Sequence, residues 1–207
     1  MKRELNIDDW ARKDHFNFFM QFEEPFFGVV IDIDCTKVYD NAKQKGLSFF
    51  LLYLHKSLVA ATKIEAFRYR ISEGKVFIYD QTHASPTINR PDGSFGFSYM
   101  DYYESFEEFN AAAQQEIDRV QNAVGLVPAV SGENVIHYSS LPWINFKSIS
   151  HARSFSFKDS SPKISFGKMT VHGDKKIMPV SIHVHHALMD GFQVSQFIEL
   201  FQQLMNE

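Results

Sequence analysis

Alternating apolar and polar residues along the chain predict several β-strands. Residues 26–35 alternate with a period of two, so their apolar side chains fall on one side of the strand. Residues 67–80 predict a hairpin that turns at 72–74, and residues 89–94 contain the turn signature Pro-Asp-Gly. Residues 83–86 are expected to be a loop that leads into a strand. Further strands are predicted at 135–140, at 164–176 with a turn at 172–174, and at 180–186.

Helical spacing of apolar residues, together with capping residues, predicts five helices. They are expected at 8–20, 36–45, 47–64, 105–120 and 193–205. Asp8 or Asp9 can cap the first helix, and Gly46 can end the second. Ser105 precedes Glu108 by three residues, which is the spacing of a capping box at the start of the fourth helix.

The order of these elements predicts one domain over residues 1–207. The chain has no internal repeat, low-complexity tract or linker rich in proline, glycine and serine. Helices and strands are mixed without strict β-α-β alternation, which favours an α/β two-layer sandwich.

Composition restricts the partners and the compartment that we expect. Hydrophobic residues make up 44% and charged residues 22% of the chain, as in ordinary soluble globular proteins. A net charge of −4 gives no electrostatic reason to expect nucleic acid or an anionic membrane surface as a partner. The N-terminus lacks the apolar region of a secretory signal, and Cys35 is the only cysteine. We therefore expect a cytoplasmic protein.

A pair of histidines near the C-terminus is the strongest candidate for chemistry. In the predicted strand 180–186, alternation places His186 on the apolar side and His183 and His185 on the other side. A histidine at the end of a buried row is largely desolvated, which favours a neutral, basic imidazole. Such a ring can accept a proton from a bound hydroxyl. Asp190, close to it, needs a cationic partner or several N–H donors to stay ionised.

Other interpretations of these residues compete with catalysis. His183 and His185 share a strand face and could be two metal ligands, but no cysteine or clustered carboxylate supplies the rest of a site. A Ser-His-Asp hydrolase would require a G-x-S-x-G nucleophile elbow, which the sequence does not contain. The histidines could also simply fill a core. Residue types alone leave this interpretation open beside catalysis.

Four segments resemble the chloramphenicol acetyltransferase family. HHALMDGF at 185–192 resembles its H-H-x-x-x-D-G motif, which also occurs in dihydrolipoamide acyltransferase catalytic domains. DDWARKDHF at 8–16, SSLPWINFKS at 139–148 and GDKKIMPVSIHVHH at 173–186 resemble three further family segments in the same order. The resemblance implies a mixed β-sheet with helices on one face, extended across the interface of a homotrimer, with active sites between subunits.

The resemblance also implies roles for five residues. His186 would be the general base that takes the proton of an acceptor hydroxyl as it attacks the thioester of acetyl-CoA. Ser139 would donate a hydrogen bond to the oxyanion, and Ser165 stands where the family usually has a threonine that bonds the transition state through a water. Asp190 would pair with Arg12 and so fix the loop that carries His186. Acetyl-CoA would be a co-substrate, with no permanently bound cofactor.

The remaining site residues follow from the same resemblance. Trp143 would line the channel for coenzyme A, and Lys168 would lie near the phosphates at its entrance. Ser48 stands where some members have a lysine for a phosphate. The acceptor pocket is expected to contain Phe18, Phe19, Thr87, Phe95, Val127 and His137.

Three pocket positions depart from the family pattern, so the acceptor is open. Phe19 replaces a tyrosine that bonds an acceptor hydroxyl, His137 replaces a small polar residue, and Val127 stands where an aromatic residue is common. Losing a hydrogen-bond partner can change the preferred substrate. Three hypotheses follow: O-acetylation of chloramphenicol, the same transfer to another hydroxyl or amine acceptor, or a non-catalytic trimeric binding module. A dihydrolipoamide acyltransferase core is a weaker alternative, because the chain has no lipoyl or linker segment.

Overall fold

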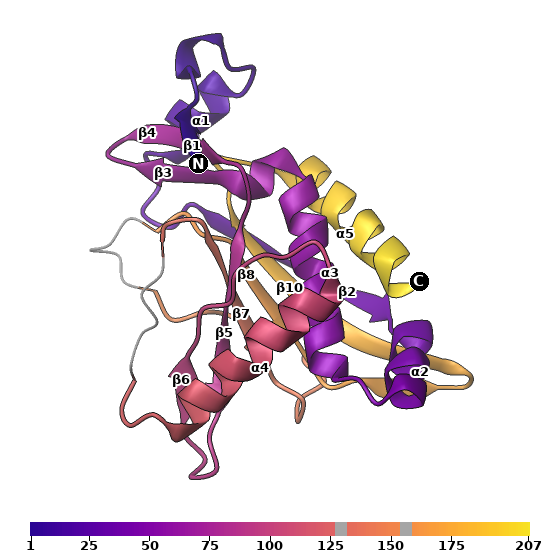
Figure 1. Ribbon diagram of the computed structural model, residues 1–207. Coiled ribbons are helices and arrows are strands. Elements are labelled where there is room, and N and C mark those ends of the chain that lie inside the picture. Colours follow the sequence, from indigo (N-terminus) through magenta and orange to yellow (C-terminus); the bar gives the residue numbers. More distant parts are fainter. Residues whose placement is uncertain (127–131, 154–158) are drawn as a thin grey trace.

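Ten strands and five α-helices make up the described part of the chain (Figure 1). The computed structural model describes residues 1–126, 132–153 and 159–207. The strands are β1 (Lys2–Glu4), β2 (Phe26–Asp34), β3 (Tyr69–Ser72), β4 (Lys75–Tyr79), β5 (His83–Asn89), β6 (Phe95–Phe97), β7 (Val135–Ser140), β8 (Lys163–Phe166), β9 (Thr170–His172) and β10 (Lys175–His185). The helices are α1 (Lys13–Phe19), α2 (Thr36–Lys45), α3 (Phe49–Lys63), α4 (Phe106–Asn122) and α5 (Gly191–Met205), with 3-10 turns η1 (Ile7–Asp9) and η2 (Glu65–Arg68).

The main sheet is mixed, as the family resemblance implies. It contains seven strands in the order β2-β10-β8-β7-β5-β6, with β9 paired to β10. Strand β7 runs parallel to both β5 and β8, whereas the other pairs in the sheet are antiparallel. Because β10 is long and central to the pairing, its residues set the positions of the neighbouring side chains on both faces.

Helices α2 to α5 lie on one side of this sheet (Figure 1). The apolar row Val180, Ile182 and Val184 of β10 is fully buried on this side, as are Leu54 and Leu58 of α3. Alternation along the strand and helical spacing along α3 turn both rows toward one core. Each such side chain contributes about 1.5–3 kcal/mol by leaving water. The two-layer arrangement predicted from the sequence is confirmed.

Two turns confirm the glycine positions predicted from the sequence. The β3–β4 hairpin turns at Glu73 and Gly74, whose φ angles of 51° and 77° match the left-handed pair of a tight hairpin. Helix α2 ends at Gly46, whose φ of 66° allows its N–H to bond to the carbonyl of Ala42.

The N-terminal region differs from the prediction in two ways. Residues 7–9 form a 3-10 turn capped by the Asn6 side chain, and Trp10 is extended, so the first α-helix begins at Lys13 rather than at Asp8 or Asp9. Strand β1 pairs with β4 to make a separate three-stranded sheet with β3. The β3–β4 hairpin was predicted, but β1 was not, because a three-residue strand is too short to show a period.

Three local assignments also change. Residues 83–86, expected as a loop, belong to β5 and pair in register with β7. Ser105 caps α4 by accepting from the N–H of Glu108, but its hydroxyl donates to Glu107, so the predicted capping box is only half formed among the described residues. The last helix begins at Gly191, two residues before the predicted start.

Candidate active site

Asp190 connects the end of the main sheet to α5. Its carboxylate accepts the N–H of Phe192 at 2.9 Å, and its own N–H donates to Gln193 at 3.0 Å, which completes a capping box. The same carboxylate meets Nη1 of Arg12 at 2.5 Å. Burial alone would raise the pKa of Asp190, but the Phe192 N–H and Arg12 outweigh it and lower the pKa below its ordinary value. The predicted pair of Arg12 with Asp190 is present.

His186 is fixed through its backbone on both sides. Its N–H donates to the carbonyl of Pro25 at 2.8 Å, and its carbonyl accepts from Nη2 of Arg12 at 3.1 Å. Arg12 therefore joins the histidine to Asp190. The ring is partly buried, and its Nδ1 is buried without a hydrogen-bond partner among the described residues.

Two phenylalanines confine the His186 ring. Phe19 of α1 stacks on it, with ring centroids 3.9 Å apart and planes 9° apart. Phe27 of β2 contacts it from 4.6 Å at a tilt of 46°. Phe18 packs against Phe19 and is 56% exposed. Both predicted pocket residues of α1 therefore lie beside the candidate base, and Phe19 covers the imidazole itself.

Three serines form a row across strands β7, β8 and β10 of the main sheet. Ser139 of β7 is in register with Ser165 of β8, which is in register with Ser181 of β10. Direct register places the three side chains on the same face. Ser165 and Ser181 are fully buried, and the Ser165 hydroxyl has no hydrogen-bond partner in the described part of the chain.

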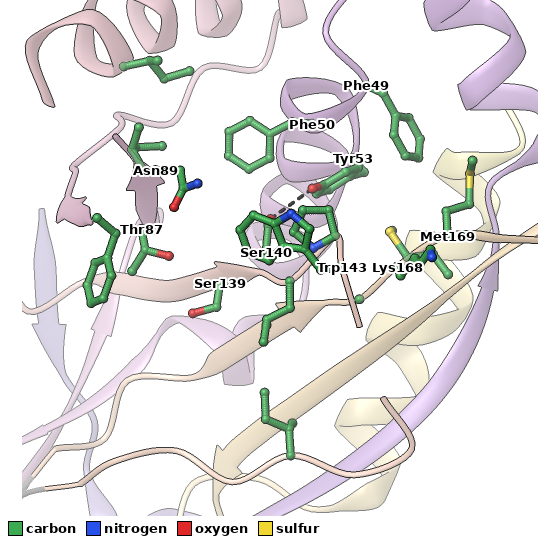
Figure 2. A pocket seen from close by; sticks show the side chains of 18 of the residues that line it. Phe49, Phe50, Tyr53, Thr87, Asn89, Ser139, Ser140, Trp143, Lys168 and Met169 are labelled. Carbon is green, nitrogen blue, oxygen red and sulfur yellow. Dashed lines mark hydrogen bonds between the residues drawn. The ribbon is translucent and has the colours of Figure 1, made fainter. Parts of the chain in front are cut away.

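A cavity of about 840 Å³ opens at Ser139 (Figure 2). Helix α3 contributes Phe49, Phe50 and Tyr53 to its wall, and the Tyr53 hydroxyl bonds to Ser140 at 3.0 Å. The remaining wall comes mainly from strands β5 to β8 and the loops that follow them. Five residues predicted for the site line this cavity: Thr87, Phe95, Ser139, Trp143 and Lys168.

The other predicted residues lie elsewhere. Ser48 caps α3 by accepting the N–H of Leu51 at 3.3 Å, so its hydroxyl has a structural partner. His137 precedes Ser139 by two residues on β7, with an exposed side chain. Val127 lies outside the described residues.

Within one chain, His186 and Ser139 are far apart. His186 lies five residues beyond Ser181, which is roughly 16 Å along a strand, while Ser139 lies two strands away, about 10 Å to the side. In Figure 1, the end of β10 that leads to α5 lies near α1. A proton acceptor must come within about 3 Å of the group that it serves. These two residues of a single chain therefore cannot act on one substrate.

The metal interpretation finds no site in the described part of the chain. His183 Nδ1 bonds to the Ser181 hydroxyl at 3.0 Å, and His185 Nδ1 accepts the N–H of Ala187 at 3.3 Å. No group of three or more potential ligands able to hold a metal ion occurs among the described residues. In the same part of the chain, no helix is both long and apolar enough to span a bilayer.

A polar cluster lies beside the serine row, and most of its members were not predicted from the sequence. Lys163 pairs with Asp159, Arg153 pairs with Glu24, and His151 packs edge-on against His183. Lys163 could have been noticed, because it shares the strand face of Ser165 two positions away. His183 lies on the predicted strand 180–186, whereas Asp159, Arg153, Glu24 and His151 reach the sheet from segments whose sequence shows no period.

Comparison with solved structures defines the fold class. A chain described as a chloramphenicol acetyltransferase superimposes with a TM-score of 0.92 at 29% sequence identity, covering 99% of this chain and 100% of that chain. The fold is therefore that of an acetyltransferase with its sheet and helices arranged as above.

Sequence comparison identifies the family. The family model described as "Chloramphenicol acetyltransferase" matches residues 2–202. A chloramphenicol acetyltransferase of Bacillus pumilus is 30% identical over 200 residues, covering 96% of this chain and 91% of the relative. One from Proteus mirabilis is 26% identical over 204 residues, covering 98% and 94%. The chain belongs to the chloramphenicol acetyltransferase family, as its motifs predict.

Proposed function

We propose that the protein transfers an acetyl group from acetyl-CoA to a hydroxyl of a small acceptor, and that chloramphenicol is the first acceptor to test. The observation that carries this proposal is the fixed loop of His186, held by Arg12, which also binds Asp190. The family relatives, which are named for chloramphenicol, support the choice of acceptor.

In this proposal the reaction is a direct transfer. His186 accepts the proton of the acceptor hydroxyl as its oxygen attacks the thioester carbonyl, so that a C–O bond forms. The tetrahedral intermediate then collapses, the C–S bond breaks, and the proton passes from the imidazolium to the departing thiolate of coenzyme A. The carboxylate of Asp190 is engaged by Arg12 and the Phe192 N–H, so it positions the loop and relays no proton.

Ser139 and Ser165 would act on the oxyanion. Their side chains share one sheet face in direct register. Ser139 borders the cavity, and the buried Ser165 hydroxyl has no protein partner among the described residues, so both can donate to the developing charge, Ser165 through a water. One such donor contributes about 10²–10³ in rate.

Acetyl-CoA would occupy the cavity as a co-substrate rather than as a resident cofactor. The walls are largely apolar and aromatic, with Trp143 and Lys168 at one side. The 67% exposed ring of Trp143 suits contact with the pantetheine chain, and the ammonium of Lys168 suits a phosphate. Use of acetyl-CoA also fits the cytoplasmic location expected from the sequence.

We further propose that each active site forms between two copies of the chain in a homotrimer. The separation of His186 from Ser139 within one chain supports this, because only a neighbouring copy can bring the two within reach of one substrate. The sheet would extend across that interface, which also protects its edge strands.

Release of coenzyme A thiol tests the proposal directly. Purified protein is mixed with acetyl-CoA and chloramphenicol, and we expect thiol release together with acetylated product. The variant His186→Ala should have no measurable turnover and an unchanged affinity for coenzyme A, whereas His172→Ala, on the exposed β9 hairpin, should behave as wild type. An active His186→Ala variant would refute the assignment of the base.

A second candidate function keeps the same chemistry with another hydroxyl or amine acceptor. It is favoured by Phe19, which stacks on the base and has no hydroxyl to offer a substrate. Turnover of another acceptor, with none of chloramphenicol, would select it. A non-catalytic binding module would be the better description if the protein bound coenzyme A but released no more thiol with any acceptor than His186→Ala does.

A further inference from the structure

Helix α3 is joined to the strand of Ser139 by two hydrogen bonds between side-chain hydroxyls. The hydroxyls of Tyr53 and Ser140 share one of 3.0 Å, which Figure 2 shows as a dashed line. The hydroxyls of Ser57 and Tyr138 share another of 3.2 Å. Tyr138 and Ser140 are the two neighbours of Ser139 on β7. The strand is therefore tied to one helix on both sides of Ser139.

The spacing of the two pairs suits a helix packed on a strand. Tyr53 and Ser57 are four residues apart, which is about 6 Å along an α-helix. Tyr138 and Ser140 are two residues apart, which is about 6.6 Å along a strand. Alternation turns both of them to the face opposite that of Ser139. The two bonds can therefore form together without occupying the hydroxyl of Ser139.

Strand β7 loses one of its two neighbouring strands at Ser139. Its pairing with β5 ends where Pro86 lies opposite Tyr138, whereas β8 continues opposite Ser139 and Ser140. A strand that is paired on one side only opens more easily than one that is paired on both. The bonds from α3 restrain β7 at the point where β5 no longer does.

Phe166 of β8 connects both tyrosines to the next strand. Its buried ring lies 4.5 Å from that of Tyr53 and 5.9 Å from that of Tyr138, measured between centroids. Phe166 is in register with Ser140 and directly follows Ser165. The same contacts therefore fix β7 and β8, and with them the two serines proposed to act on the oxyanion, relative to each other.

The hydroxyls behind β7 are not placed to do chemistry themselves. Burial raises the pKa of Tyr53 to about 12, and it also raises the pKa of Tyr138. Both tyrosines therefore keep their protons at neutral pH and cannot serve as bases there. Ser57 and Tyr138 are not among the described residues that line the cavity at Ser139, so a substrate bound in it does not touch them.

We propose that Tyr53 and Ser57 are positioning residues for the acetyl transfer, because they hold Ser139 where its hydroxyl meets the oxyanion. They act through Ser140 and Tyr138 rather than on the reacting atoms. This inference rests on the proposed function and adds the residues that support its oxyanion donor. A donor must lie about 2.7–3.1 Å from the developing charge, so a small shift of β7 lowers the rate.

The test removes single hydroxyls behind β7 and asks whether the loss of rate depends on Ser139. Tyr138→Phe and Tyr53→Phe are each made in wild type and in Ser139→Ala, and thiol release is measured with the acceptor that wild type turns over fastest. In wild type we expect kcat to fall about 3–10-fold. For Tyr138→Phe, the KM for acetyl-CoA should stay within about twofold. In Ser139→Ala the same changes should lower kcat by less than about twofold, because the group that they position is gone.

A second comparison separates positioning from stability. Tyr138→Phe leaves the buried hydroxyl of Ser57 without its partner, whereas Tyr138→Phe combined with Ser57→Ala removes both hydroxyls. Thermal unfolding should show a lower Tm for the single variant and a partial recovery for the double variant, while kcat stays low in both. Recovery of kcat together with Tm would mean that the pair affects stability only, and would overturn the inference.

Tyr79→Phe is the matched control. It removes a tyrosine hydroxyl of the separate small sheet that bonds to Glu133 at 2.7 Å, and it should keep the wild-type kcat. A wild-type kcat in both Tyr138→Phe and Tyr53→Phe, or an equal loss with and without Ser139, contradicts the inference and leaves acetyl transfer standing. If Ser139→Ala itself has the wild-type rate, the inference fails together with the assignment of that donor. If wild type releases thiol with no acceptor, the transfer proposal fails as well.

Discussion

At the scale of single residues, the position of Phe19 changes how the candidate base is understood. The ring stacks flat on His186 at 3.9 Å and, with Phe27 on the imidazole as well, restricts its rotation. This restriction favours catalysis by a base, because an imidazole that rotates away no longer lies within reach of the acceptor hydroxyl. Phe19 therefore lacks the tyrosine hydroxyl expected at this position, but its ring still positions the imidazole of His186.

We expect Phe19→Leu to lower kcat by about 3–10-fold with little change in the KM for acetyl-CoA, because the imidazole gains freedom without losing its backbone contacts. Phe19→Tyr keeps the stacked ring and should preserve kcat. Steady-state kinetics with both substrates varied provide the measurement. Phe77→Leu, the same change in the separate small sheet, is the matched control. Wild-type kcat in Phe19→Leu would mean that the stack does not position the base.

At the scale of elements, the loop between β10 and α5 depends on Asp190 in two ways. The residue caps the helix, and it binds Arg12 of the chain segment that leads into α1. The two contributions can be separated, because asparagine is as good an N-cap as aspartate but carries no charge. Substitution to alanine removes both.

Asp190→Asn should lower the free energy of unfolding at pH 7 by about 1 kcal/mol, and Asp190→Ala by about 1–2 kcal/mol more. The pKa of Asp190 is lowered in the folded protein, so its charged contribution is fully present above the unfolded pKa and disappears as pH falls through the folded value. The difference between wild type and Asp190→Asn should therefore vanish in acid. Urea unfolding at pH 7 and well below pH 3.8, the ordinary pKa of an aspartate, measures it, and a difference that does not depend on pH would argue against the ion pair.

At the scale of the whole molecule, the sheet separates the two halves of the site. His186 lies at one end of β10, and Ser139 lies two strands away and further along the sheet. An assembly of several copies can place the His186 end of one chain against the cavity of the next. In the proposed trimer, activity would be a property of the assembly, which predicts that two inactive variants can complement each other.

Co-expression of His186→Ala with Ser139→Ala should give complementation. Ser139→Ala alone should lose about 10²-fold in rate as one oxyanion donor is removed, and His186→Ala alone should be inactive. If subunits mix at random in equal amounts, about a quarter of shared sites receive both intact residues, since each is supplied with even chance by a different chain. Specific activity near one quarter of wild type in the co-purified mixture supports a shared site. Activity no higher than the average of the two single variants contradicts it.

The sequence by itself determined the local elements and the main candidates for chemistry. Periods of two and 3.6 residues located β2, the second half of β10 and helices α2 to α5, and the turns at Gly46 and Gly74 were predictable because only a few residues adopt positive φ. The need of Asp190 for a cation also followed from local pattern. Each of these properties depends on residues near one another along the chain.

Only the tertiary structure decided which distant residues meet. It placed Phe19 on His186, aligned three serines across β7, β8 and β10, and brought His151 to the cavity of Ser139. Cross-strand register and the packing of non-periodic segments arise from contacts between residues far apart in sequence, and the local pattern carries no record of them. For the same reason the family motifs could suggest the transfer chemistry, whereas the polar cluster beside the serine row emerged from the folded chain alone.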